Sequence, residues 1–380
     1  MNFLSEAEEI KEEILELRRH LHRHPELGDR EFETADLIAE KLRSYGIEAE
    51  RLLDTAVIGT LKGGKPGKTA ALRADIDALP VKEETGVFYA SENSGVMHAC
   101  GHDVHMAAAM GAAKLLSRHK EELSGTVKFF FQPAEESGGG ALRMIEEGCM
   151  EGVSAVFGAH VDPDLPSGAI GVRSGPFYAA AEILDIEVLG KTAHGAYPER
   201  GNDALKCACE LLLKLEELPQ KAAAEKCVLT FGTLRGGEVF NVIADRAVFS
   251  GVLRTFGTEN IRRMKEQIRK TADTLSEKYR TKIRLTFRNP YSGVWNSETE
   301  TDLAEKAARR VLPAEKVLRI PEPKLITEDF GYFLEASKGS FYHVGAGCPL
   351  SLHNSCFLPS EEALLNLTAV HAQVLWDYLV

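Results

Sequence analysis

The chain has 380 residues, more than one ordinary domain needs, and this length favours two domains. Hydrophobic residues make up 44% and charged residues 27%, a balance typical of a globular protein with a large core, which argues against extended disorder. The 57 acidic side chains outnumber the 45 basic ones and give a formal charge of −12, so nucleic acid and anionic membranes are poor partners. Seven cysteines, an odd number, and an acidic N-terminal segment without a secretory pattern lead us to expect a cytoplasmic protein with reduced thiols.

Periodic apolar residues predict the first elements of the chain. Apolar side chains spaced four, three and four apart, from Ile10 to Leu21, form one stripe of a helix that ends before Pro25. A second helix is predicted from about Glu31 to Tyr45. The next predicted elements are strands at 69–73, 126–131 and 155–159 and helices at 104–119 and 141–147. Strands that alternate with helices predict an α/β domain with a largely parallel sheet covered on both faces.

The pattern changes near Ser174. Charged and apolar residues alternate from Asp185 to Val188, which is typical of a half-exposed strand. The predicted elements here are a strand at 182–188, a helix at 203–217, strands at 228–234 and 247–256, a helix at 258–279 and a strand at 282–287. The order β-α-β-β-α-β is that of a ferredoxin-like split unit, so we predict an inserted α+β domain at 177–289. The first domain would comprise 1–176 and 290–380, completed by a helix at 301–311, a strand at 341–344 and a helix from Glu361.

Polar side chains of metal-binding type follow the predicted strands of the first domain. The loop MHACGHDVH carries a thiol and imidazoles, and strands 126–131, 155–159 and 341–344 lead to FQPAEE, His160 and LHNS. Because ligands of open α/β sheets bind beyond the carboxyl ends of the strands, these four distant segments should converge. They supply five candidate metal ligands, which are Cys100, His102, Glu136, His160 and His353.

The types and number of these ligands narrow the choice of ion. Imidazole and thiolate favour zinc, cobalt, nickel or manganese over magnesium and calcium. Five ligands exceed the need of one closed tetrahedral site and suit two ions about 3.5–4 Å apart. We therefore predict a binuclear centre that activates a water molecule near neutral pH.

Two adjacent carboxylates suggest a division of roles. Glu135 and Glu136 lie on an irregular loop where neighbouring side chains diverge, so one can bind metal while the other accepts the proton of the attacking water. A positioned carboxylate base contributes roughly 10²–10⁴ in rate. We assign Glu135 as the base and Glu136 as the ligand, although spacing alone allows the reverse.

Other polar residues near these segments have structural explanations as well. Asp77 either orients a ligand histidine or closes a turn, and the two alternatives are equally supported. Asp103 is expected as the N-cap of the helix at 104–119, which is compatible with a supporting contact to a ligand imidazole. Surface or capping contacts rather than metal binding are expected for three histidines near the first turn, which are His20, His22 and His24.

Segments spread over essentially the whole chain carry a family resemblance. They include RRHLHRHPELGDREFETA, LRADIDALP, MHACGHDVH, FQPAEE, GKTAH, FNVIADRA, GVLRTF and LHNS. In these segments the chain resembles the metal-dependent aminoacylase/carboxypeptidase amidohydrolases, the group of hippurate hydrolase, N-acetyl-diaminopimelate deacetylase and the auxin-conjugate hydrolases. The resemblance implies a zinc-peptidase-like catalytic domain and an inserted lid that carries the interface of a homodimer. It also implies two divalent transition-metal ions per subunit, held by the five ligands named above, with Glu135 as base.

The resemblance adds residues that patterns alone would not single out. It implies that His194 steadies a tetrahedral oxyanion and that Asn241 and Arg254 contact the substrate carboxylate or carbonyl. Without it, Arg254 would be interpreted as an exposed strand residue. The chain departs from the family pattern at Ala244, where proline is usual, and in GAYPERGNDALK after His194, so the acyl and side-chain preference stays open.

These inferences lead to one functional hypothesis and two alternatives. We predict hydrolysis of the amide bond of small N-acyl amino acids by a metal-activated water. The first alternative is a carboxypeptidase or dipeptidase with the same centre. The second is an inactive, metal-stabilised amino-acid-binding protein, against which the complete ligand set and Glu135 argue.

Overall fold

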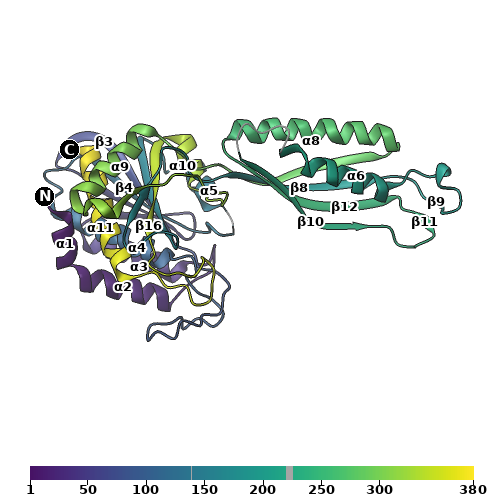
Figure 1. Ribbon diagram of the computed structural model, residues 1–380. Coiled ribbons are helices and arrows are strands. Elements are labelled where there is room, and N and C mark those ends of the chain that lie inside the picture. The colour runs from purple at the N-terminus through teal and green to yellow at the C-terminus, as the bar shows by residue number, and fades with distance from the viewer. Residues whose placement is uncertain (138, 220–225) are drawn as a thin grey trace. The chain divides into compact units, whose positions relative to one another are not determined.

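A computed structural model describes residues 1–137, 139–219 and 226–380, and its chain forms two compact units (Figure 1). Unit 1 comprises Met1–Phe177, Trp295–Glu322 and Asp329–Val380, and unit 2 comprises Tyr178–Val294 and Pro323–Glu328. None of the helices in the described part of the chain is both long and apolar enough to cross a membrane.

Unit 1 is built on an eight-stranded sheet (Figure 1). In spatial order its strands are β1 (Glu48–Leu52), β2 (Ala56–Lys62), β4 (Ser124–Gln132), β3 (Lys65–Asp75), β5 (Val153–Asp162), β16 (Lys338–Gly345), β6 (Ile170–Val172) and β15 (Val317–Arg319). The central run from β4 to β16 is parallel, which confirms the predicted α/β class with a mostly parallel sheet. Antiparallel β1 and β2 extend one edge and were not predicted.

Helices bury the apolar residues of this sheet. The helices of unit 1 are α1 (Phe3–Glu9), α2 (Lys11–Arg23), α3 (Phe32–Ser44), α4 (His102–Arg118), α5 (Gly140–Glu146), α9 (Glu298–Val311), α10 (Gly331–Ala336) and α11 (Glu361–Leu379). Helices α4 and α11 pack against each other and are buried along most of their length, as their nearly continuous apolar sequence requires. The predicted first helix is in fact two, α1 and α2, which meet at Ile10.

The described residues of unit 2 form a four-stranded antiparallel sheet that packs with helices, and this confirms the ferredoxin-like α+β class. Its strands run in the order β10 (Cys227–Gly236), β12 (Arg246–Thr255), β8 (Ala180–Leu189) and β13 (Lys282–Tyr291), and its helices are α6 (Ala204–Glu216) and α8 (Thr258–Tyr279). Alternate residues of β8, such as Leu184 and Ile186, join the core beneath the helices. Two short antiparallel pairs are also present: β9 (Ala193–His194) with β11 (Val242–Ile243), and β7 (Gly175–Pro176) with β14 (Trp295–Asn296).

Candidate metal centre

The structure brings the predicted ligand segments together at one place in unit 1. The start of α4, the loop after β4, the end of β5 and the loop after β16 all contribute side chains. Among the groups whose ligand atoms lie within 4.8 Å of one another, three consist of the predicted ligands and Glu135: Cys100, His102 and His160; Cys100, Glu136 and His353; and His102, Glu135 and Glu136. Cys100 belongs to two groups, so the groups adjoin and form one cluster.

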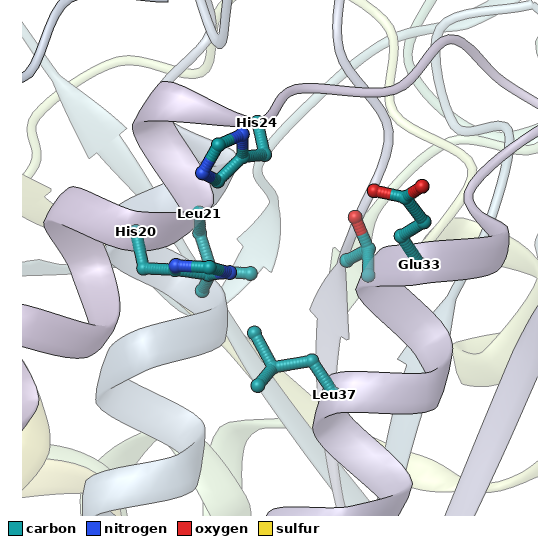
Figure 2. A pocket seen from close by; sticks show the side chains of 6 residues that line it. His20, Leu21, His24, Glu33 and Leu37 are labelled. Carbon is teal, nitrogen blue, oxygen red and sulfur yellow. The ribbon is translucent and has the colours of Figure 1, made fainter.

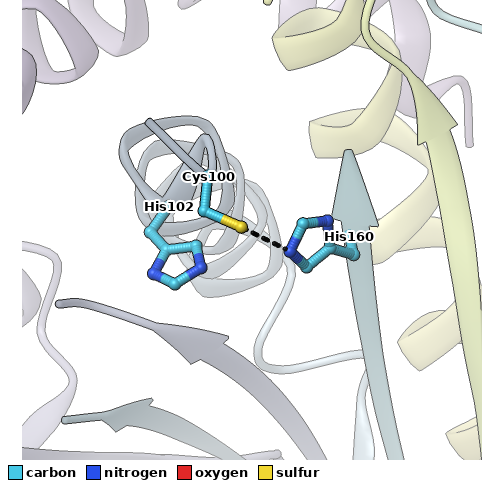
Figure 3. Close-up of side chains that lie close together, drawn as sticks. All are labelled: Cys100, His102 and His160. Carbon is cyan, nitrogen blue, oxygen red and sulfur yellow. Dashed lines mark hydrogen bonds between the residues drawn. The ribbon is translucent and has the colours of Figure 1, made fainter. Parts of the chain in front are cut away.

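Cys100 and His160 form the buried part of the cluster. Cys100 lies in the loop just before α4, and Figure 3 shows its sulfur directed at His160 of β5, with Sγ 3.3 Å from Nε2. The Nδ1 atom of His160 donates to the Val161 carbonyl at 2.7 Å, which leaves the Nε2 lone pair directed into the cluster. Burial lowers the pKa of His160 well below its ordinary value, so the ring is neutral, the form that binds metal.

Asp77 fixes two members of the cluster. Its backbone carbonyl accepts a hydrogen bond from Nδ1 of His102 at 2.8 Å, and its Oδ1 lies 3.3 Å from the same nitrogen. Its Oδ2 accepts the backbone N–H of Glu136 at 2.9 Å. The opposite nitrogen of His102, Nε2, is buried and has no hydrogen-bond partner among the described residues. Asp77 therefore fixes the orientation of this imidazole, and its Nε2 lies 3.5 Å from Oδ2 of Asp75. The contact of Asp77 with the opposite nitrogen is that of a carboxylate–histidine–metal arrangement.

Glu136 and His353 form the more exposed side of the cluster. Nε2 of His353 lies 3.1 Å from Oε1 of Glu136, while Glu135, one residue earlier, is buried. Burial alone would raise the pKa of Glu136, but the His353 hydrogen bond and the charge of His102 lower it to about 2. Burial, together with the neighbouring carboxylates, raises the pKa of the Cys100 thiol well above its ordinary value. A cation at this position would lower the pKa of the Cys100 thiol and favour the ionised form of Glu136. The set of one thiol, three imidazoles and carboxylates suits transition metals.

A buried ion-pair network behind the cluster was not predicted. Asp75 accepts a hydrogen bond from Nδ1 of His105 at 2.6 Å and one from Arg73 at 2.7 Å, and Arg73 also donates to Asp329 at 2.9 Å. The other nitrogen of His105 accepts the Val161 N–H at 2.9 Å, so both ring nitrogens are occupied within the protein. The available signal was the placement of Arg73 and Asp75 two residues apart, on one face of a buried strand.

Asp103 differs from its predicted role. Helix α4 begins at His102 with Gly101 at the N-cap (φ +81°), so the interpretation of Asp103 as the cap is wrong. Its carboxylate lies in the first turn and accepts hydrogen bonds from Arg18 and His22, each at 3.0 Å. Asp103 therefore ties α4 to α2 through buried charges, and the hydrogen bonds found for it in the described chain do not include one to a ligand imidazole.

The three histidines near the first turn divide into two environments. His22 is buried, bonded to Asp103 and to Glu83 at 3.1 Å, so the expected surface position is wrong for this residue. His20 and His24, with ring centroids 4.6 Å apart, line a pocket of about 130 Å³ that Glu33 also lines (Figure 2).

The residues singled out by resemblance alone lie in unit 2. His194 is exposed on β9 and pairs with Val242 of β11, and the carbonyl of Asn241 accepts the Gly195 N–H at 2.8 Å. The two residues are therefore neighbours in unit 2. Arg254 lies on β12 on the face opposite the helices and donates to the Leu325 carbonyl at 2.8 Å.

The fold and the cluster together define a metal-dependent hydrolase of amide bonds. The model of "Peptidase family M20/M25/M40" matches residues 71–377, which is most of the chain. The chain belongs to this family.

Individual relatives cover nearly all of the chain. It is 37% identical over 359 residues to N-acetyl-L-cysteine deacetylase of Bacillus subtilis, which corresponds to 94% of this chain and 86% of that protein. It is 36% identical to thermostable carboxypeptidase 1 of Saccharolobus solfataricus, over 97% of this chain and 96% of that one. The crystal structure of a dinuclear metal binding peptidase of the M20 family from Bacillus subtilis superposes with a TM-score of 0.88 at 34% identity, covering 98% of this chain and 99% of that one.

Proposed function

We propose that this protein hydrolyses the amide bond of N-acyl amino acids, with Glu135 as the general base. The observation that supports the proposal most directly is the grouping of carboxylate oxygens of Glu135 and Glu136 with a nitrogen of His102 within 4.8 Å. This grouping allows Glu136 to bind a metal while its buried neighbour faces the water that attacks the substrate. The name of the Bacillus subtilis deacetylase supports an N-acyl amino acid as the substrate class.

We propose two divalent transition-metal ions per subunit, held by Cys100, His102, Glu136, His160 and His353, and zinc, manganese, cobalt and nickel all suit these donors. Ions bound there would act as Lewis acids. They would lower the pKa of a water molecule to about 7 and would polarise the amide carbonyl. The family's dinuclear metal binding peptidase supports the number of ions.

The side chains would divide the remaining chemistry. Glu135 takes a proton from the attacking water as the C–O bond forms, and then delivers that proton to the amide nitrogen as the C–N bond breaks. The products are a carboxylic acid and a free amino acid. His194 would donate to the developing oxyanion, and Asn241 and Arg254 would bind the substrate carboxylate, for which a planar guanidinium is well suited.

A substitution of the base tests this mechanism. Glu135→Gln keeps the size of the side chain but cannot accept a proton, so kcat should fall by about two or more orders of magnitude while the metal content stays unchanged. Glu147→Gln is a matched control, since Glu147 is an exposed glutamate at the end of α5. Full activity of Glu135→Gln would refute the assignment.

Carboxypeptidase or dipeptidase activity is the second candidate, and it is favoured by the 36% identity to thermostable carboxypeptidase 1. The two functions separate in a screen that compares N-acetyl amino acids with dipeptides and N-blocked peptides. The apoprotein should be loaded separately with manganese, zinc, cobalt and nickel, because the ion affects the rate. A higher kcat/KM for dipeptides in every metal form would favour the peptidase.

We also propose a cytoplasmic homodimer that associates through unit 2. All seven cysteines are free thiols, which fits a reducing compartment. Strand β10 is an edge strand with mostly exposed residues, and Phe240 nearby is fully exposed. Light scattering of the purified protein should give twice the mass of one chain.

A further inference from the structure

Ala134 has an unusual backbone conformation directly before the two glutamates of the candidate site. Its φ is +52°, in the left-handed region that side chains with a Cβ disfavour. Alanine has no polar side chain that could stabilise this conformation locally. Contacts with the rest of the protein must therefore hold it.

The contacts come from both sides of the residue. Its N–H donates to Oε1 of Glu31 at 2.9 Å, and its carbonyl accepts the N–H of Gly140 at 3.3 Å. Glu31 is fully buried, at the N-cap of α3, and Thr55 also bonds its side chain. The turn before α3 packs closely as well, because a Cβ on Gly28 would lie 3.2 Å from Cα of Ala134.

This conformation determines where the glutamates point. A change of φ at Ala134 rotates the chain that follows, and that chain begins with Glu135 and Glu136. The next fixed point is the Glu136 N–H, which Asp77 accepts at 2.9 Å. Two buried carboxylates from different segments thus hold alternate N–H groups of one short loop, and the residue between those groups is Glu135.

We propose that Glu31 is a positioning residue for the metal centre, which holds Ala134 in its left-handed conformation so that Glu135 and Glu136 face the cluster. The expected effect of Glu31 on turnover rests on the proposed function. The expected effect of Glu31 on metal binding requires only the cluster of candidate ligands. The hydrogen bonds found for the Glu31 side chain in the described chain are to the Ala134 N–H and to Thr55, so it would act through the backbone.

The primary test measures zinc affinity of the full-length apoprotein by competition with a chromophoric chelator. Glu31→Ala removes the acceptor of the Ala134 N–H, so the zinc dissociation constant should rise about 10–100-fold and kcat at saturating zinc should fall by a similar factor. Glu31→Gln keeps an acceptor oxygen and should restore most of the affinity. Glu33→Ala removes an exposed carboxylate two residues away (Figure 2) and should change neither quantity.

A second substitution separates positioning from general destabilisation. Glycine adopts the left-handed conformation without strain, so Ala134→Gly combined with Glu31→Ala should recover zinc affinity relative to Glu31→Ala alone. If Glu31→Ala does not fold, Glu31→Asp withdraws the carboxylate by one methylene and should show the same loss and the same rescue.

The outcomes distinguish this inference from the proposed function. Wild-type zinc affinity in folded Glu31→Ala, or no rescue by Ala134→Gly, would overturn the positioning role. A wild-type protein that binds zinc but hydrolyses neither N-acyl amino acids nor peptides would overturn the proposed function, and the affinity series would still decide the role of Glu31.

Discussion

The buried charges around Asp103 predict a specific pH dependence of stability. His22 directs Nδ1 at Oδ2 of Asp103 at 3.0 Å and Nε2 at Oε1 of Glu83 at 3.1 Å. An ionised carboxylate accepts hydrogen bonds but cannot donate one. Both ring nitrogens of His22 must therefore donate, so the ring must be an imidazolium. Burial alone would lower the pKa of His22, but Asp103 and Glu83 raise it to about 9.

The sign and size of the effect follow from this shift. A pKa raised in the folded state stabilises the protein fully below the unfolded value of about 6.5, and this stabilisation is lost as the pH rises through about 9. Since one pKa unit corresponds to about 1.4 kcal/mol, the contribution of His22 is roughly 3 kcal/mol. Asp103 and Arg18 remain paired over this pH range, so the stability that is lost comes from deprotonation of the His22 ring.

Urea unfolding of the protein in the presence of a chelator measures this pH dependence of stability without a contribution from metal binding. Far-UV circular dichroism should be recorded from about pH 6 to about pH 9.5 for the wild type and for His22→Gln. The stability difference between them should shrink by roughly 3 kcal/mol over this range. His119→Gln is the control, since His119 pairs with Glu6 at 2.8 Å but is partly exposed. An unchanging difference would show that the pKa of His22 is the same in the folded and unfolded chains, which would refute the reasoning.

Two further predictions concern the metal directly. Asp77→Ala removes the acceptor of the Glu136 N–H, so zinc affinity measured by chelator competition should fall about 10–100-fold, with a smaller loss for Asp77→Asn; unchanged affinity would refute its orienting role. Stripping the metal should abolish hydrolysis and lower the unfolding temperature in calorimetry, because a ligand at 100 times its Kd stabilises by about 2.7 kcal/mol. Re-addition of zinc, manganese, cobalt or nickel should restore both, and full activity in the chelated protein would contradict a metal-dependent reaction.

The fold could be predicted where local patterns carry the information. Helix α8, Thr258–Tyr279, was predicted with its observed bounds because a long amphipathic stripe ends in a turn. The edge strand β1 and its neighbour β2 were missed, since β1 depends on pairing with β2, and β2 on pairing with β4, rather than on a strong pattern of their own. The break at Ile10 was missed because Ile10 itself is buried and fits the apolar stripe.

The convergence of the ligand segments could be predicted because topology determines it. Parallel strands end at one edge of a sheet, so residues after β4 and residues near the end of β5 must approach each other whatever the details of packing. The supporting residues follow no such rule. Arg73 and Asp329 are 256 positions apart, and Arg18 and Asp103 are 85 apart, and no local periodicity relates the two members of either pair. A buried charge requires a partner, but the sequence around it does not identify that partner.

Some of the residues that support the candidate metal centre from behind lie outside the segment that carries the candidate ligands. The family match spans residues 71–377 and includes all five candidate ligands. Three side chains that bond to segments carrying candidate ligands precede it, which are Arg18, His22 and Glu31. Arg18 also donates to the Pro359 carbonyl at 2.7 Å, in the segment between His353 and α11. A chain that began at residue 71 would therefore keep every candidate ligand but lose the hydrogen bonds of Arg18 and His22 to Asp103 and of Glu31 to the Ala134 N–H. We therefore expect truncation of the N-terminal helices to weaken metal binding although every candidate ligand remains.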